Sequence, residues 1–118
     1  MELISELADR TCQPCKGVPS MSKEKVEAYL TKLPGWRLDG DRIEKDYEFK
    51  DYITGLDFAN RVGRLAEQQD HHPEILIRWR HVSITFTTHS IKGLSENDFI
   101  MAAKAEREYA RSIAKLPP

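Results

Sequence analysis

Residues 75–89 read ILIRWRHVSITFTTH and contain two short segments rich in β-branched and aromatic residues. In the second segment Val82, Ile84 and Phe86 alternate with polar residues, which is typical of a strand with one buried face. We expect segments 75–79 and 82–88 to form a hairpin whose two-residue turn lies at Arg80-His81. In that register, residues whose numbers sum to about 161 face each other across the hairpin.

A second hairpin is predicted earlier in the chain. Asp39-Gly40 lies between the short runs 36–38 and 42–43, and an Asp-Gly step in such a place is a strong hairpin signal. The strand that follows extends through residues 43–49, although Lys45 interrupts its alternation of apolar and polar residues.

Three helices are predicted around these strands. The first follows Ser22 and stops before Pro34, the second is capped by Asp51 and runs to about residue 69, and the third begins at the capping-box pattern 95–98 and runs to about residue 115. The order α-β-β-α-β-β-α favours an α+β sandwich in which helices cover an antiparallel sheet.

Composition narrows the range of functions. The 118 residues are enough for one domain, which we place at 22–118 after an irregular leader at 1–21. A formal net charge of −1 gives no reason to expect nucleic-acid binding. No apolar run is long enough for a membrane span, and the N-terminus lacks the features of a secretory signal, so we expect a cytoplasmic protein.

The two cysteines, Cys12 and Cys15, form a Cys-x-x-Cys pair in the leader. No second Cys/His pair at a matching spacing follows, as a structural zinc site would require. A redox motif would follow a strand and open a helix, whereas this segment is rich in loop-forming residues. A local structural or incidental role is therefore favoured, and a site completed by a second subunit stays open.

The histidines form the most suggestive cluster. Residues 67–74 read EQQDHHPE, and His72 and His89 satisfy the sum that would place them opposite each other in the predicted hairpin. Glu67 lies four residues before His71, within reach on the last helical turn. Three imidazoles backed by carboxylates would be equipped for proton transfer.

Simpler explanations compete with this one. His71 and His72 could cap the end of a helix, and His89 could be a solvated residue at a strand end. His81 belongs in the turn, and Asp98 fits a capping role. A three-histidine zinc site is disfavoured, because successive side chains in an extended segment diverge.

The chain resembles the pterin-4a-carbinolamine dehydratases over most of residues 22–115. The matching positions are Glu67-x-x-x-His71-His72-Pro73, the aromatic Trp79, Thr88-His89, Gly93-Leu94-Ser95 and Asp98. The resemblance implies a four-stranded antiparallel sheet with helices on one side, assembly as a homodimer or homotetramer, and catalysis without metal or cofactor.

The activity implied by the resemblance is removal of water from 4a-hydroxytetrahydropterin to give quinonoid dihydropterin. His71, His72 and His89 would be catalytic. We expect His72 and His89 to transfer protons directly, because of their predicted opposition, and His71 to support them. Seven further residues are expected to contact the substrate or to orient a histidine, Glu67 in particular orienting His71: Glu67, Asp70, Pro73, Thr87, Thr88, Ser90 and Asp98.

A non-enzymatic role is the alternative. The same fold could serve as a protein-binding module, as in family members that act as transcriptional coactivators, or as a regulator of an aromatic amino-acid hydroxylase. The intact histidine set favours the enzyme, because binding through a helical face would not require it.

Overall fold

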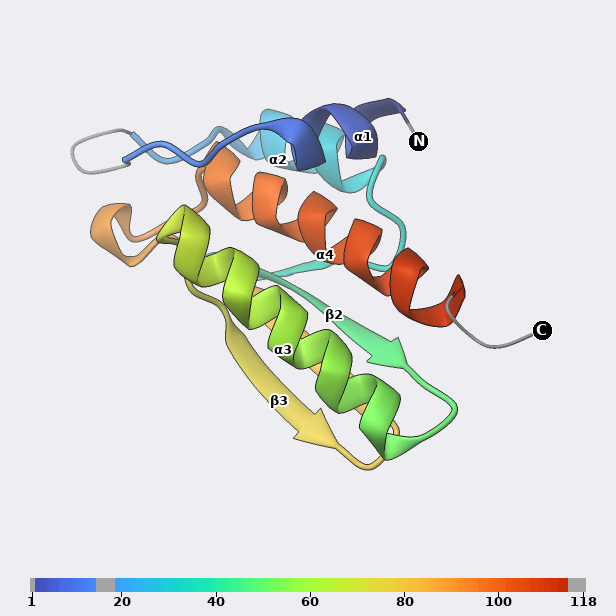
Figure 1. Ribbon diagram of the computed structural model, residues 1–118. Coiled ribbons are helices and arrows are strands. Elements are labelled where there is room, and N and C mark those ends of the chain that lie inside the picture. The colour runs from blue at the N-terminus through green and yellow to red at the C-terminus, as the bar shows by residue number, and fades with distance from the viewer. Residues whose placement is uncertain (1, 15–18, 115–118) are drawn as a thin grey trace.

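The computed structural model describes residues 2–14 and 19–114 (Figure 1). Its elements, in chain order, are α1 (Glu2–Asp9), α2 (Lys23–Leu30), β1 (Arg37–Asp39), β2 (Arg42–Glu48), α3 (Tyr52–Gln69), β3 (Glu74–Arg78), β4 (His81–Phe86), the short 3-10 helix η1 (His89–Ile91) and α4 (Glu96–Ala114). From residue 22 onwards, the predicted order of three helices and two hairpins is confirmed.

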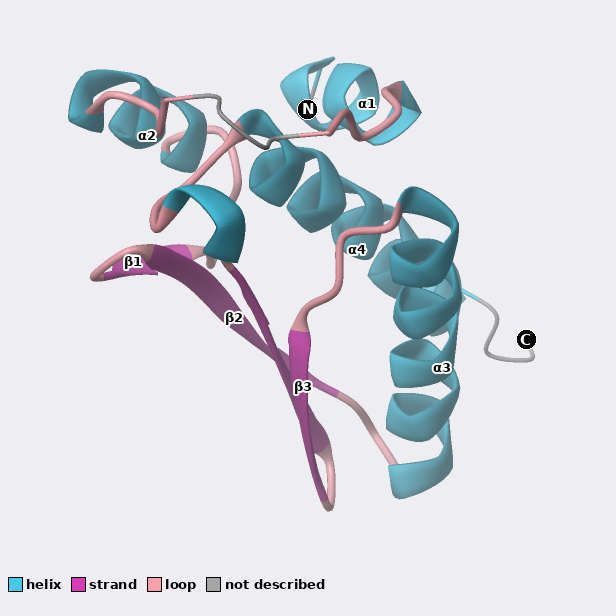
Figure 2. Ribbon diagram, turned by 90° about the vertical axis from the view of Figure 1, so that its left-hand side faces the viewer, coloured by secondary structure: helices cyan, strands magenta, loops and turns pink. Residues whose placement is uncertain are grey.

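The four strands form one antiparallel sheet in the order β1-β2-β4-β3. The helices lie on one face of this sheet, as Figure 2 shows from the side, and the other face is open. In both views α4 lies between α1 and α3. The predicted α+β sandwich is therefore confirmed.

The core lies between the sheet and the helices. Alternate residues of β2 and β4 point into the core, and α3 and α4 supply the side chains that pack against them. The fully buried members with the largest side chains include Tyr47, Phe58, Phe86, Phe99, Ile43, Ile84 and Met101. The opposite side chains of β4, which include Ser83 and Thr85, face the open side of the sheet and are polar, so the observed alternation follows the sequence pattern.

The predicted register of the second hairpin is wrong, because each residue pairs with a partner two positions earlier in the chain than predicted. Arg78 pairs with His81 and Glu74 pairs with Thr85, so the turn lies at Trp79-Arg80. The backbone N–H of Phe49 donates to the carbonyl of Arg80 (2.8 Å), which continues the β2–β4 ladder up to the turn. His81 is consequently the first residue of β4 and not a turn residue.

The first hairpin turns at Gly40-Asp41, because Asp39 pairs with Arg42. Gly40 has φ +65°, a conformation that glycine adopts without strain. Lys45 on β2 has the same pleat direction as the buried Ile43, and its ammonium group donates to Glu106 on α4 (2.7 Å). Lys45, which interrupts the alternation in the sequence, therefore faces the helices and forms an ion pair with Glu106.

Helix α3 begins and ends as expected. The Asp51 carboxylate accepts from the backbone N–H of Thr54 (2.8 Å) at the first turn. The helix ends at Asp70, which has a left-handed conformation (φ 54°). Ile53 in the first turn is 62% exposed, and the interior is filled by Phe58 five residues further on.

The leader differs from the expected irregular segment. Residues 2–9 form α1, which packs along α4 with Leu7 and Ala8 buried in the main core. Two polar contacts add to this packing, from Lys104 to the carbonyl of Ala8 (2.7 Å) and between Arg107 and Asp9 (2.6 Å). The division of the chain at residue 22 stays a prediction.

Within the described ranges, no helix is both long enough and apolar enough to cross a membrane.

Candidate functional site

The tightest polar contact among the predicted site residues joins His71 to Asp98. Nε2 of His71 lies 2.6 Å from Oδ1 of Asp98, whose side chain is fully buried. The His71 side chain is 11% exposed, and its ring is stacked on Phe86 of β4 at 6.2 Å between centroids and 13° between planes. A carboxylate on one edge and an aromatic face beneath fix the orientation of this imidazole.

The other oxygen of Asp98 is held by the protein itself. Oδ2 accepts from the hydroxyl of Thr88 (2.7 Å) and from the backbone N–H of Ser95 (3.0 Å). The Thr88 and Ser95 hydroxyls are also hydrogen-bonded to each other (2.9 Å). Asp98 therefore completes the capping box that starts α4, as the sequence suggested, and at the same time holds His71.

These contacts decide which ring nitrogen of His71 carries a proton. An ionised carboxylate only accepts hydrogen bonds, so Nε2 is the donor in the bond to Asp98. In the neutral ring, Nδ1 then has the free lone pair and can act as a base. The prediction that Glu67 orients His71 is wrong, because the carboxylate that contacts the His71 ring belongs to the buried Asp98.

The end of α3 gives His71 its place. The left-handed Asp70 turns the chain, and the backbone N–H of His71 donates to the carbonyl of Ala66 (3.1 Å), as is usual at helix C-termini. Pro73 follows just before β3 and is partly buried. The side chain of Asp70 is exposed at this end of the helix.

His72 lies in a more open environment. Its Nε2 is 2.8 Å from Oε1 of Glu67, and the two side chains are 55% and 82% exposed. Glu67 is therefore the partner of His72 and not of His71. An exposed pair of this kind orients a ring but stabilises the fold little.

His89 begins η1, directly after Thr88, and is exposed, as is Ser90. The register of the hairpin rules out the expected pairing of His72 with His89, because the β3–β4 ladder starts at Glu74 and Thr85. Thr87 is partly buried, and its hydroxyl donates to the carbonyl of Asp41 (2.6 Å). Thr87 therefore connects the strand end to the first hairpin.

His81 lies on the open face of the sheet. Its Nδ1 is 2.7 Å from Asp46, which also accepts from Arg78 (2.6 Å) and from Ser83 (2.8 Å). Asp46 is on β2, next to β4, and its cluster is separate from the His71–Asp98 contact. His81 is therefore a suitable control position in experiments on the other histidines.

In the part of the chain that the structure describes, no group of three or more His, Cys, Asp or Glu side chains is placed to hold a metal ion. Cys15 lies outside the described residues. Cys12 lies beside α4, with its sulfur 3.9 Å from the carbonyl of Asn97.

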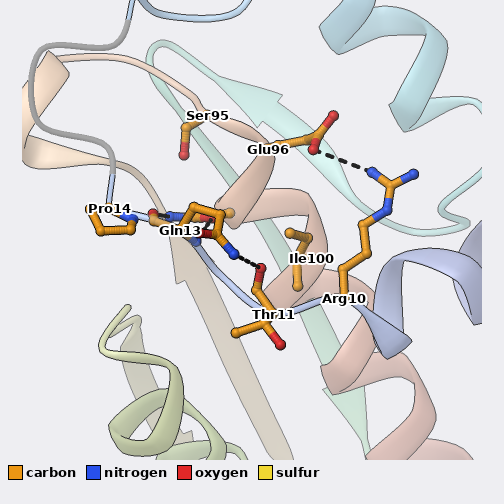
Figure 3. A pocket seen from close by; sticks show the side chains of 8 residues that line it. Arg10, Thr11, Gln13, Pro14, Ser95, Glu96 and Ile100 are labelled. Carbon is orange, nitrogen blue, oxygen red and sulfur yellow. Dashed lines mark hydrogen bonds and ion pairs between the residues drawn. The ribbon is translucent and has the colours of Figure 1, made fainter.

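Two cavities adjoin the elements that carry His71 and Asp98. One, of about 200 Å³, is lined by Asp70, Gln69 and leader residues 12–14. The other, of about 480 Å³, lies between the leader and the start of α4 and is shown in Figure 3. Its volume is within the range of small-molecule sites. Sequence reasoning did not anticipate that the leader would form walls of either cavity.

Comparison with known proteins identifies the family. The family model described as pterin 4 alpha carbinolamine dehydratase matches residues 19–108, which include the histidines and Asp98. The chain belongs to this family. The match covers well over half of the chain and starts within the leader, ahead of α2.

Similar proteins carry the same family name. A protein from Azoarcus sp. (strain BH72) is 44% identical over 108 residues, covering 89% of this chain and 92% of its own. One from Rubrobacter xylanophilus is 46% identical over 106 residues, covering 88% and 99%. Both are named "Putative pterin-4-alpha-carbinolamine dehydratase".

Two solved structures are similar to this dehydratase-family chain. A transcriptional coactivator/pterin dehydratase from Brucella melitensis superposes with a TM-score of 0.72 at 33% identity, covering 75% of this chain and 97% of its own. A pterin dehydratase-like RuBisCO assembly factor of the alpha-carboxysome has a TM-score of 0.53 at 20% identity, covering 63% and 86%. The second likeness concerns the fold alone.

Proposed function

We propose that this member of the family is an active dehydratase that removes water from 4a-hydroxytetrahydropterin and releases quinonoid dihydropterin. The observation that carries the proposal is the buried Asp98 carboxylate on Nε2 of His71. An oriented imidazole with one free ring nitrogen is the equipment that acid/base catalysis needs. The names of the relatives support the same substrate class.

The reaction requires two proton transfers. One proton is delivered to the hydroxyl on C4a, so that the C–O bond breaks and water leaves. The proton on N5 passes to a base, and its bonding electrons form the C4a=N5 double bond. Imidazoles suit both steps near neutral pH and contribute about 10²–10⁴-fold to the rate.

Three histidines supply these groups in the proposal. His71 is held by Asp98, His72 is held by Glu67, and His89 directly follows Thr88, the residue that donates to Asp98. The register removes the reason for giving His72 and His89 the direct roles. We therefore assign His71 a direct proton-transfer role, which replaces the supporting role expected from the sequence.

Other expected site residues have different parts in the proposal. Thr88 and Asp98 are buried and act by holding His71, whereas exposed Asp70 and Ser90 are available for polar contacts with the pterin ring. Pro73 and Thr87 are partly buried and shape the same end of the molecule. A cytoplasmic location and assembly as a homodimer or homotetramer remain parts of the proposal.

The test is the rate of dehydration of 4a-hydroxytetrahydropterin generated in situ, after treatment with a chelator. We expect the wild-type protein to dehydrate the substrate faster than the spontaneous rate. The rates of His71→Ala, His72→Ala and His89→Ala should fall well below the wild-type rate, and the rate of His81→Ala should match it. A wild-type rate no faster than the spontaneous one would refute the enzyme. Activity abolished by the chelator and restored by zinc would replace histidine catalysis with a metal mechanism.

A binding or regulatory role is the second candidate. The solved relative from Brucella melitensis is named both a transcriptional coactivator and a pterin dehydratase. A protein partner, such as an aromatic amino-acid hydroxylase, would leave the fold unchanged and make the histidines dispensable. Binding that persists in the His71→Ala variant, together with no dehydration by wild type, would favour this candidate.

A further inference from the structure

The leader crosses from the end of α3 to the start of α4. We define the strap as residues 10–14, which follow α1 directly (Figure 1). The backbone N–H of Cys12 donates to Oε1 of Gln69, the last residue of α3, at 2.7 Å. The strap is thereby fixed to α3 two residues before His71.

On its other side the strap is bonded to Asn97 in the first turn of α4. The backbone N–H of Gln13 donates to Oδ1 of Asn97 (3.0 Å), and Nδ2 of Asn97 donates to the carbonyl of Gln13 (2.5 Å). Asn97 is 6% exposed and directly precedes Asp98. One backbone residue and one side-chain amide thus form a reciprocal pair of hydrogen bonds beside the carboxylate that holds His71.

An ion pair extends the attachment. Arg10 lies 3.2 Å from Glu96, the first residue of α4, as Figure 3 shows at the edge of the larger cavity. Glu96 also accepts from the hydroxyl of Tyr29 on α2 (2.9 Å). Both charged side chains are more than 40% exposed, so we expect the amide contacts to Gln69 and Asn97 to contribute more than this pair.

These contacts connect the two elements that carry His71 and Asp98. The ring and its carboxylate come from different helix ends, and their 2.6 Å contact depends on the spacing of those ends. The strap spans the same two ends, because Cys12 and Gln13 are hydrogen-bonded to Gln69 and Asn97, which lie within two residues of the pair in the sequence.

We propose that the strap is a clamp that holds the end of α3 against the start of α4, and that Gln69 and Asn97 are positioning residues for the His71–Asp98 pair. The catalytic part of this inference rests on the proposed function. The geometric part concerns the His71–Asp98 contact itself and stands independently of any activity.

Two variants remove the clamp, Gln69→Ala and Asn97→Ala. Gln69→Glu is the conservative variant, because it keeps an oxygen acceptor for the N–H of Cys12. Arg107→Ala is the matched control, because it loosens α1 by removing the bond to Asp9 (2.6 Å) and leaves the strap contacts intact. Each variant is made in the full chain, and its thermal unfolding is measured first.

The first readout is spectroscopic. The proton on Nε2 of His71 is observed by NMR in protein labelled with ¹⁵N-histidine and assigned by its loss in His71→Gln. We expect this resonance to broaden or exchange faster in Gln69→Ala and Asn97→Ala, and to match wild type in Gln69→Glu and Arg107→Ala. An unchanged resonance in both alanine variants would overturn the clamp, whether or not the protein is a dehydratase.

The second readout is the dehydration rate. Small displacements of catalytic groups cost up to about 100-fold in rate, so we expect kcat to fall at least roughly tenfold in the clamp variants, with a smaller change in KM. Arg107→Ala should keep the wild-type kcat even where its unfolding temperature falls. If kcat follows the unfolding temperature across all four variants, the strap is only a stabilising segment and the proposal is wrong.

Discussion

Nε2 of His71 and Oδ1 of Asp98 lie 2.6 Å apart, although the residues are 27 positions apart in the chain. The same carboxylate accepts the N–H of Ser95 and so caps the helix on which Asp98 lies. Helix initiation and orientation of the imidazole therefore depend on one buried side chain. A substitution at Asp98 should therefore affect both the start of α4 and the orientation of His71.

Replacing Asp98 by Asn should strongly reduce the dehydration rate. The amide cannot accept hydrogen bonds on both sides, so either His71 or the Thr88–Ser95 group loses its acceptor. In a comparable exchange at a histidine–aspartate pair the wrong tautomer costs about 10⁴-fold, and we expect kcat/KM to fall by on the order of 10²–10⁴. Thr88→Ser, which keeps the hydroxyl, serves as the control. A wild-type rate in Asp98→Asn would show that His71 needs no carboxylate.

Asp70 offers a way to separate backbone from side-chain effects. Its φ of 54° suits glycine, so Asp70→Gly should keep the stability of the fold while it removes the carboxylate. Because we propose that this carboxylate contacts the pterin, we expect KM to rise in Asp70→Gly.

The companion variant Asp70→Val tests the backbone. A β-branched residue in this conformation should reduce the free energy of unfolding by about 1–2 kcal/mol, measured by chemical denaturation. An unchanged KM in Asp70→Gly would remove Asp70 from the substrate contacts.

Glu106 should be important for stability. Its Oε2 accepts from Nε1 of Trp36 (3.1 Å), from Nζ of Lys45 (2.7 Å) and from the hydroxyl of Tyr47, and the Lys45 and Glu106 side chains are only 17% and 15% exposed. Burial and this carboxylate raise the pKa of Tyr47 far above its ordinary value, so its hydroxyl remains a donor.

We expect Glu106→Ala to reduce the free energy of unfolding by about 3 kcal/mol, because it leaves the partly buried charge of Lys45 without its carboxylate partner. Adding Lys45→Met should restore part of that loss. Glu44→Ala, which breaks the exposed pair with Arg37, is the control and should cost no more than about 1 kcal/mol. Equal effects of Glu106→Ala and Glu44→Ala would contradict the importance of burial.

Stability should depend on pH through Asp46. Partial burial acts to raise the pKa of Asp46, but hydrogen bonds from Ser83 and His81 and the nearby charges of His81 and Arg78 outweigh burial and hold it below the ordinary value. A lowered pKa in the folded state stabilises the fold above the ordinary carboxyl pKa, and this contribution is lost as pH falls towards the folded value.

Chemical denaturation at several pH values tests this dependence. We expect wild type to be more stable than Asp46→Asn near pH 7, and the difference to shrink below about pH 4. A difference that stays constant from neutral to acid pH would mean that the charge of Asp46 is not responsible.

Much of the fold follows from local patterns. The alternation in 82–86, the Asp-Gly step near residue 40 and the capping residue Asp51 were sufficient to predict the strands and α3 to within a residue or two, and Ser22 marked the start of α2. The end of α2 at Leu30 and the helix α1 in the leader were not predicted. The side-chain oxygen of Ser22 does accept the N–H of Lys25 (3.2 Å) at the start of α2. These features are decided within a few residues of the chain, where sequence spacing and distance in space agree.

The hairpin register could not be decided in this way. A shift of two residues leaves every side chain on the same face of the sheet, so Val82, Ile84 and Phe86 are buried in the predicted register and in the observed one alike. The backbone hydrogen bond between Phe49, which directly follows β2, and Arg80 belongs to the complete sheet and cannot be predicted from the sequence of the hairpin alone. The predicted opposition of His72 and His89 failed for this reason.

The sequence by itself determined the order of the strands and helices after residue 22, the capping residues, and the family motif that contains His71, His72 and His89. Only the tertiary structure decided their partners: Asp98 for His71, Glu67 for His72, and the strap beside Gln69 and Asn97. Local patterns report which face of an element is buried. Which distant side chain meets that face depends on how the helices pack on the sheet, and no spacing within one segment contains that information.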